Sequence, residues 1–294
     1  AGTRLVALRW VLFGLVAYDL WTVMLQHASR YGVGGFNVAQ VGLLDQILPL
    51  PNPSIISFIV LLTGFFCALA VCGVWTRLSI TISAIGYFGV YLWSQADSYQ
   101  HHYLVGLLMF ICCFVPTATW HATTPQEKPR WHWAIQLIYV QIAIVYFWTA
   151  ITKLDPIWFT GITLDQIAAE PQIRAFMSAF ESRLSLDPGQ SYRFLAVLIV
   201  LGEFFAALVF MIPKLRLAGL FIVPWFHVSV ELLGVDIELF SYYMIGLNLV
   251  LLSPPSVWRL MDDKSRTLTL FLKPFQAWPS QIVARLAACA ATAL

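Results

Sequence analysis

The chain has 294 residues, of which 60% are hydrophobic and 11% charged, with a mean hydropathy of +0.76. Soluble domains carry about 25% charged residues, so this composition excludes an ordinary soluble protein and predicts a polytopic membrane protein. The net charge of +2 gives no indication of a nucleic-acid partner, and we expect the lipid bilayer to be the main surrounding.

Eight apolar segments approach the length of about 20 residues that a membrane-spanning helix needs. They cover about residues 5–25, 55–75, 78–95, 103–117, 131–152, 192–212, 215–233 and 239–253. The first is interpreted as a retained helix, because it is too long for the apolar core of a signal peptide and carries Asp19. The predicted fold is all-α: a bundle of about eight transmembrane helices with an outer-facing cavity over residues 1–255, then an amphipathic interfacial tail over residues 256–294.

The distribution of positive charge predicts the orientation. Most of the 17 Lys and Arg residues fall in predicted loops on the side that carries both termini. The positive-inside rule then places both termini in the cytoplasm. Lys153 and His101 are expected on the opposite, periplasmic or lumenal side.

The five cysteines predict neither a disulfide framework nor a metal centre. Four of them lie inside apolar segments, where cysteine behaves as a small hydrophobic residue. None has metal-ligand spacing with a histidine, and the sequence contains no CxxCH haem motif, phosphate-binding glycine loop or G-x-S-x-G motif. We therefore expect no metal and no haem.

A polar stripe on the fifth apolar segment forms the first candidate site. The stripe consists of Tyr139, Ile142, Tyr146, Thr149 and Lys153, which follow helical spacing. A lysine at a helix end commonly extends to water as a snorkelling anchor, and this is the alternative interpretation. Two tyrosines and a threonine are too polar to face lipid, so we expect the stripe to line an interior groove.

Four ionisable residues interrupt other apolar segments, and such groups usually face a cavity or another helix. They are Asp19, Glu203, His227 and Glu231. His227 and Glu231 are four residues apart, share a helix face and could form a hydrogen bond. Each of the four is interpreted either as part of a polar clamp between helices or as lining of a substrate cavity.

Two adjacent histidines, His101 and His102, open the fourth apolar segment. Successive helix residues point about 100° apart, so only one of them can face a groove shared with Lys153. A single histidine in such a place is more often an interfacial hydrogen-bonding residue than a catalyst.

Three stretches together resemble a known family in their order and spacing: YQHHYLVGLLMF, IQLIYVQIAIVYFWTAITKLDPIWFTG and GLFIVPWFHVSVELLG. The family is HTTM, the membrane domain shared with vitamin K-dependent gamma-carboxylase, and the opening LRWVLFGLVAYDL is similar to its first helix. In the carboxylases, the lysine that matches Lys153 is taken to deprotonate vitamin K hydroquinone. Oxygen converts the product to a strong base, which removes a gamma proton from a glutamate before carbon dioxide adds.

The resemblance implies a reduced naphthoquinone of the vitamin K type as the cofactor, Lys153 as the base and His101 as an assisting group. The remaining candidate cofactor-binding residues are Tyr146, Thr149, His227 and Glu231. Two positions depart from the family pattern, since Gln100 stands in place of an asparagine and Thr152 in place of a second lysine of the animal enzymes. Those enzymes also continue into a large lumenal domain that helps to hold the peptide substrate, so we expect the quinol chemistry to carry over better than the peptide substrate.

Three classes of function stay open at this point. The first is a quinol-dependent enzyme of the carboxylase or epoxidase type. The second is a non-catalytic subunit of a larger membrane complex that holds lipid or quinone. The third is a small-molecule transporter, although the short or broken helices that usually mark a midplane transport site are not evident.

Overall fold

The structure is a computed structural model, which describes residues 2–31, 42–47, 50–93, 100–115, 132–167, 171–234, 237 and 239–261. Every regular element within these residues is helical. The helices are α1 (Gly2–Asp19), α2 (Leu25–His27), α3 (Gly42–Ile47), α4 (Pro53–Cys72), α5 (Thr76–Trp93), α6 (Gln100–Cys112), α7 (His132–Thr152), α8 (Pro156–Phe159), α9 (Ile162–Ile167), α10 (Pro171–Leu184), α11 (Gln190–Met211), α12 (Arg216–Leu232) and α13 (Phe240–Leu252). A π-type segment, Leu20–Met24, continues α1 into α2, and short 3-10 turns follow α2 and precede α12.

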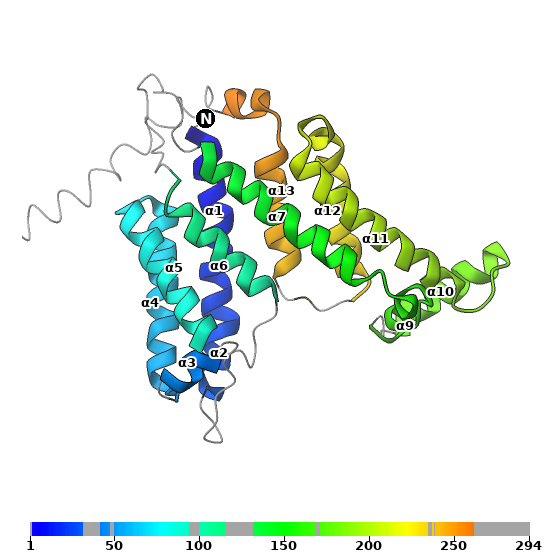
Figure 1. Cartoon of the computed structure of the whole chain (residues 1–294), viewed down its shortest axis with the longest axis horizontal. Helices are drawn as coiled ribbons and strands as arrows, with labels where there is room; N and C mark the ends of the chain where they lie inside the picture. Colours follow the sequence, from blue (N-terminus) through cyan, green and yellow to red (C-terminus); the bar gives the residue numbers. More distant parts are fainter. Residues whose placement is uncertain are drawn as a thin grey trace, which may run out of the picture.

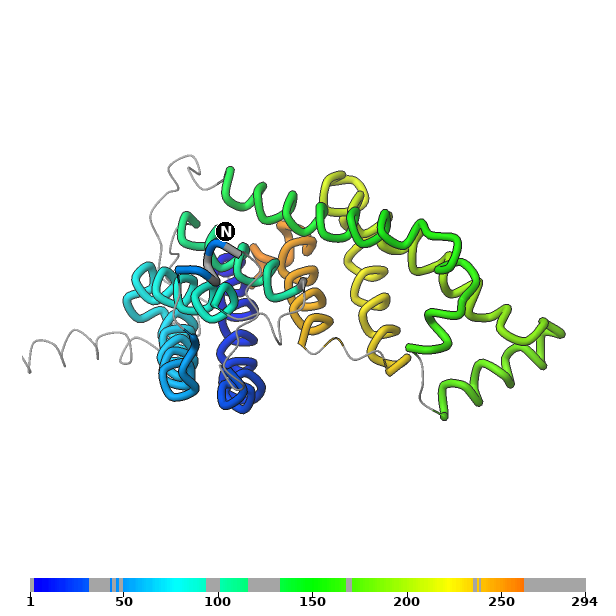
Figure 2. The backbone as a smooth tube through the Cα atoms, turned by 60° about the horizontal axis from the view of Figure 1, so that its bottom comes forward, coloured from blue at the N-terminus to red at the C-terminus, as the bar shows by residue number. Residues whose placement is uncertain are grey.

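The long helices pack in a chain of neighbours (Figures 1 and 2). Helix α1 contacts α4 on one side and α13 on the other, and α4 continues into the antiparallel pair with α5. Helix α13 pairs with α12, and α12 contacts α11. Helices α7 and α11 lie against each other along much of their length, which makes this pair the framework for the candidate site described below.

All eight predicted apolar segments correspond to helices, but they differ in how well they could cross a bilayer. Five are long and apolar enough within the described residues: Thr3–Arg30, Pro53–Cys72, Trp133–Thr152, Gln190–Met211 and Pro213–Leu232. A sixth span is obtained if α13 and the following helix Pro255–Met261, bent by 90°, are counted together. The chain is therefore a multi-helix membrane protein with five or six candidate spans by these criteria. The part of the predicted interfacial tail beyond residue 261 lies outside the described residues.

The first three residues of the predicted polar stripe on α7 are buried inside the protein, and Thr149 and Lys153 are half-buried. Tyr139, Ile142 and Tyr146 are 2%, 0% and 3% exposed, whereas Phe147 and Trp148, on the opposite face, are 47% and 61% exposed. Their burial confirms that the stripe faces the interior, as expected from two tyrosine hydroxyls that would otherwise be unpaired in hydrocarbon.

An arginine near the N-terminus fixes the start of α7 to the end of α13. The Arg4 guanidinium donates hydrogen bonds to the carbonyls of Val250 and Leu251 and to the Tyr139 hydroxyl, and Tyr139 in turn donates to the Leu251 carbonyl. The last carbonyls of a helix have no partner within it, and Arg4 provides one for α13. The Arg216 guanidinium lies 4.3 Å from the centre of the Tyr139 ring, so α1, α12 and α13 all contact this tyrosine of α7.

The connection between α7 and α11 consists of three short helices, α8 to α10. Figure 1 shows α9 and α10 beyond the N-terminal end of α11. A small cluster of buried Leu164, Met177, Tyr192 and Ala196 holds the connection to α11. Glu181 of α10 also accepts hydrogen bonds from the backbone N–H and hydroxyl of Ser191, at 3.0 and 2.5 Å.

Candidate functional site

Local sequence signals determine where α7 ends and therefore where Lys153 lies. Pro156 occupies the first turn of α8 and Asp155 is its N-cap, accepting a hydrogen bond from the Ile157 N–H at 2.7 Å. An N-cap residue and a residue before proline both favour extended backbone, so the chain leaves α7 just before Asp155. Lys153 consequently falls in the turn between α7 and α8, beyond the last full turn of the apolar helix.

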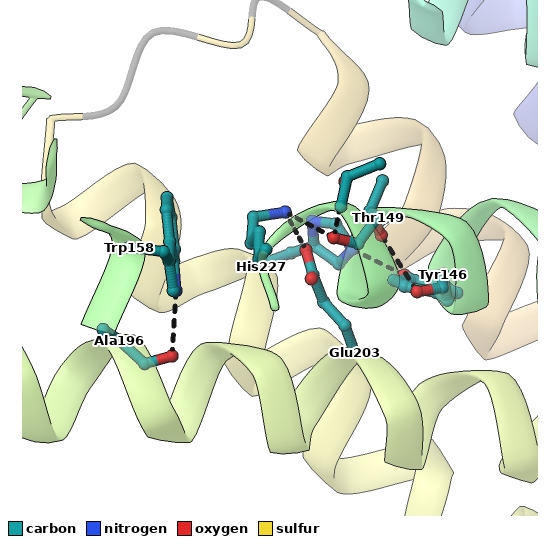
Figure 3. A network of polar contacts seen from close by, with 8 residues as sticks. Tyr146, Thr149, Trp158, Ala196, Glu203 and His227 are labelled. Atoms are coloured by element: carbon teal, nitrogen blue, oxygen red, sulfur yellow. Dashed lines mark hydrogen bonds and ion pairs between the residues drawn. The ribbon is translucent and has the colours of Figure 1, made fainter. Parts of the chain in front are cut away.

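The side chain of Lys153 forms an ion pair with Glu203 of α11, and Figure 3 shows Glu203 in the surrounding polar network with Thr149 and Tyr146. Its Nζ lies 2.8 Å from Oε1 of Glu203 and also donates a weaker hydrogen bond to the Thr149 carbonyl at 3.4 Å. The side chains of Lys153 and Glu203 are 24% and 9% exposed. The pair is thus largely shielded, and a shielded pair is screened less by salt than one on an aqueous surface.

An aromatic ring completes the surroundings of the ammonium group. The centre of the Trp158 ring lies 5.5 Å from the Lys153 Nζ, within the range of a cation–π contact. Trp158 is itself fixed to α11, because its Nε1–H donates to the Ala196 carbonyl at 3.1 Å. The ammonium group is therefore surrounded by groups from α7, α8 and α11.

A second polar contact lies two turns earlier on α7. The Tyr146 hydroxyl and Nε2 of His227 are 2.6 Å apart, and His227 of α12 is only 2% exposed. Which of the two atoms donates depends on the tautomer of the imidazole. The Thr149 hydroxyl donates to the Tyr146 carbonyl at 3.0 Å, within the same helix.

His227 therefore does not bond to Glu231, the partner that the sequence offered on its own helix. Among the described residues, His227 Nδ1 and Glu231 Oε1 are buried atoms without a hydrogen-bond partner. The Tyr146 hydroxyl of α7 lies within hydrogen-bonding distance of the His227 imidazole. The i,i+4 spacing places His227 and Glu231 on one helix face, but it does not by itself bring their polar atoms into contact. The four proposed cofactor-binding residues thus divide into a Tyr146–His227 contact, a back-bonded Thr149 and a separate Glu231.

The two adjacent histidines of α6 point to different neighbours, as the 100° between successive helix residues predicts. His102 Nδ1 lies 2.7 Å from the Tyr87 hydroxyl of α5. The ring of His101 lies 5.3 Å from that of Phe240, which in turn lies 5.9 Å from that of His227. His101 is thus connected to the Tyr146–His227 contact through an aromatic ring, whereas the Lys153 side chain contacts Glu203, Thr149 and Trp158.

Glu203 was identified in the sequence only as an unexpected charge, and its pairing with Lys153 was missed. A signal for it was present, because Glu203 is the one acidic residue within α11, and an isolated charge in an apolar helix requires a partner. The sequence alone did not indicate which Lys or Arg side chain would pair with Glu203. Within the described residues, no group of three or more His, Cys, Asp or Glu side chains could hold a metal ion.

The fold and the site define a multi-helix integral membrane protein with a shielded lysine–carboxylate pair between two of its long helices. The sequence matches the HTTM domain family over residues 2–257, and the chain belongs to that family. At the level of the family it is a gamma-carboxylase-like membrane protein, as its resemblance in three helices predicted. No solved structure matches this chain.

Proposed function

We propose that this protein deprotonates a reduced naphthoquinone of the vitamin K type, with Lys153 as the base and His101 as an assisting group. The observation that supports this most strongly is the direction of the Lys153 side chain. A snorkelling lysine extends along its helix axis to water. Here the Nζ instead turns sideways onto α11, 2.8 Å from Glu203 and with an aromatic ring above it.

Unpaired buried polar atoms on α11 and α12 suit a ligand that carries hydroxyl groups. Glu203 Oε2, Glu231 Oε1 and His227 Nδ1 are buried without a hydrogen-bond partner in the described part of the chain. A buried polar atom left unpaired costs about 1–3 kcal/mol, and a bound hydroxyl, which can both donate and accept, can remove that cost. When bound, a reduced naphthoquinone would supply two phenolic hydroxyls and the oxygen chemistry that generates a strong base.

The membrane topology is part of the proposal. We propose that the eight apolar helices all cross the bilayer, which places both termini on one side, in the cytoplasm, by the positive-inside rule. Lys153 then opens onto an outer-facing cavity on the periplasmic or lumenal side. Fusion of a topology reporter after residue 29, which precedes the second apolar helix, and after residue 262 should give opposite signals.

The test of function is epoxide formation from several reduced naphthoquinones, in membranes that contain the wild-type protein or the Lys153→Ala variant. We expect turnover that is lost in Lys153→Ala and retained in Lys214→Ala, which removes an exposed lysine at another turn. Thermal unfolding must be measured in parallel, because Lys153→Ala leaves Glu203 without its partner. Absence of turnover with folded wild-type protein would refute the enzymatic proposal.

A second candidate function, a non-catalytic subunit that holds lipid or quinone, is favoured by the surface of α12. Only 17% of the Pro213–Leu232 segment is buried. Phe221, Trp225 and Leu232 are 69%, 68% and 69% exposed and lie on one helical face. Copurification of a stoichiometric membrane partner that is lost in Phe221→Ser, without any quinol turnover, would support this function instead.

A further inference from the structure

The contact between Lys153 and Glu203 raises a difficulty for any reaction in which the lysine accepts a proton. At an N···O separation of 2.8 Å, the carboxylate stabilises the charged ammonium form. An ammonium group has no lone pair, so it cannot receive a proton from a ligand. The base must therefore be generated within the site before it can act.

Glu203 is suited to receive the proton that Lys153 has to lose. Of the contacts that the structure describes for the Lys153 side chain, the Thr149 carbonyl and the Trp158 ring are not titratable, whereas the Glu203 carboxylate is. Tyr146 and His227 approach from α7 and α12 but bond to each other. The shortest proton path from the ammonium group is thus the existing hydrogen bond to Glu203 Oε1.

The surroundings of Glu203 weaken its ionised form. The residue is 7% exposed, and its second oxygen, Oε2, is buried without a partner in the described part of the chain. A carboxylate with one unsatisfied oxygen in poorly hydrated surroundings bears a desolvation cost that the neutral acid largely avoids. Moving one proton across the contact removes both charges at once, so it lowers the desolvation cost of both partners.

We propose that Glu203 shares one proton with Lys153 and that the pair, not the lysine alone, is the base of the site. In the first step the ammonium N–H bond breaks and a carboxyl O–H bond forms, which leaves a neutral amine and a neutral acid. In the second step, which rests on the function proposed above, the amine takes a hydroxyl proton from the ligand. Glu203 acts through Lys153 and is thus a positioning residue that determines the charge of the amine.

Chemical labelling tests the first part of the proposal, that Glu203 controls the charge of the Lys153 amine, without any ligand. Purified protein in lipid nanodiscs is treated with acetic anhydride across a range of pH, and acetylation of Lys153 is measured by mass spectrometry against exposed Lys214 as an internal reference. Glu203→Gln keeps the side-chain shape but removes the charge. We expect it to increase the relative labelling of Lys153 by about tenfold or more near neutral pH, with Glu203→Asp closer to wild type.

The pH profile of acetylation distinguishes a change in the charge of the Lys153 amine from a change in its accessibility. If Glu203 controls the charge, Glu203→Gln moves the labelling midpoint to lower pH and leaves the high-pH plateau unchanged. A higher plateau with an unmoved midpoint would mean that the variant merely opens the site, and this would overturn the proposal. Equal labelling in wild type and Glu203→Gln would overturn it as well.

Turnover then separates this proposal from the proposed function. A lone lysine base predicts faster quinol epoxidation in Glu203→Gln at neutral pH, because more of the amine is uncharged. A shared-proton pair predicts that kcat falls by about tenfold or more with little change in KM, and that Glu203→Asp restores part of it. Faster turnover in Glu203→Gln would overturn the proposal. Absence of turnover in wild type would remove the proposed function, while the labelling profile would still show whether Glu203 controls the charge of the Lys153 amine.

Discussion

The hydrogen bond between Tyr146 and His227 provides a direct test of how α7 is held to α12. Tyr146→Phe removes one hydroxyl and keeps the ring, so it changes the packing against Phe210 very little. The lost contact is short, at 2.6 Å, and both residues are at least 97% buried from solvent. The variant therefore isolates the polar contribution.

The expected loss in the free energy of unfolding follows from the polar groups that Tyr146→Phe leaves unpaired. Interhelical hydrogen bonds in membrane proteins contribute about 0.6 kcal/mol on average and up to about 1.7 kcal/mol. His227 Nδ1 already lacks a partner in the described part of the chain, so Tyr146→Phe leaves both imidazole nitrogens unpaired. An orphaned buried polar group costs about 1–3 kcal/mol, and we expect Tyr146→Phe to reduce the free energy of unfolding by about 2 kcal/mol.

A double-mutant cycle checks the origin of this loss. Unfolding is followed by tryptophan fluorescence in mixed micelles for Tyr146→Phe, His227→Leu and the double variant. We expect the double variant to be more stable than the sum of the single changes predicts, by about 1–2 kcal/mol, because it leaves no orphaned group. Tyr87→Phe, which removes the hydroxyl that faces His102 at 2.7 Å, is the matched control. It should be additive with His227→Leu, and additivity of Tyr146→Phe with His227→Leu within about 0.3 kcal/mol would refute the reasoning.

Three further predictions concern other parts of the structure. Arg4→Leu should destabilise the protein by about 2–3 kcal/mol in the same unfolding assay, because it removes charged hydrogen bonds to the end of α13; Arg4→Lys should recover part of this. A Cβ at Gly219 would lie 2.1 Å from Val209 Cγ1, so Gly219→Ala should cost about 1–3 kcal/mol, and Val209→Ala in the same chain should recover most of it. The Ser191 hydroxyl, which donates to the Glu181 carboxylate, holds the pKa of that carboxyl below its ordinary value. The resulting stabilisation is complete above about pH 5 and is lost as the pH falls through the lowered value; melting curves at decreasing pH should show this loss, and it should be smaller in Ser191→Ala.

Much of the fold was accessible from the sequence because bilayer-spanning helices are specified by local composition. A run of about 20 apolar residues identifies most of the long helices without reference to their neighbours. Pro156 and Asp155 likewise mark the end of α7. The polar stripe from Tyr139 to Lys153 was predicted to face inward because hydroxyl groups need partners that lipid cannot supply.

The number of helices that cross the bilayer was harder to predict from the sequence. Helix α6 is short, with its apolar part limited to His101–Cys112. Helix α13 is long enough for a span only if it is counted together with the following helix, Pro255–Met261, across a bend of 90°. A bend of this kind depends on what the following segment packs against, and Trp258, just after the bend, is buried in the main core. Local composition contains no information about that contact.

The sequence by itself determined that the chain is a helical membrane protein, roughly which segments form its long helices, and which side of α7 is buried. These follow from local hydrophobicity and from the period of the helix. Only the tertiary structure decided the partners: Glu203 for Lys153, Tyr146 for His227 in place of Glu231, and Phe240 between His101 and His227. The reason is physical, because a buried charge or imidazole can be satisfied by any suitable group that packing brings within hydrogen-bonding distance, and packing depends on all the helices at once.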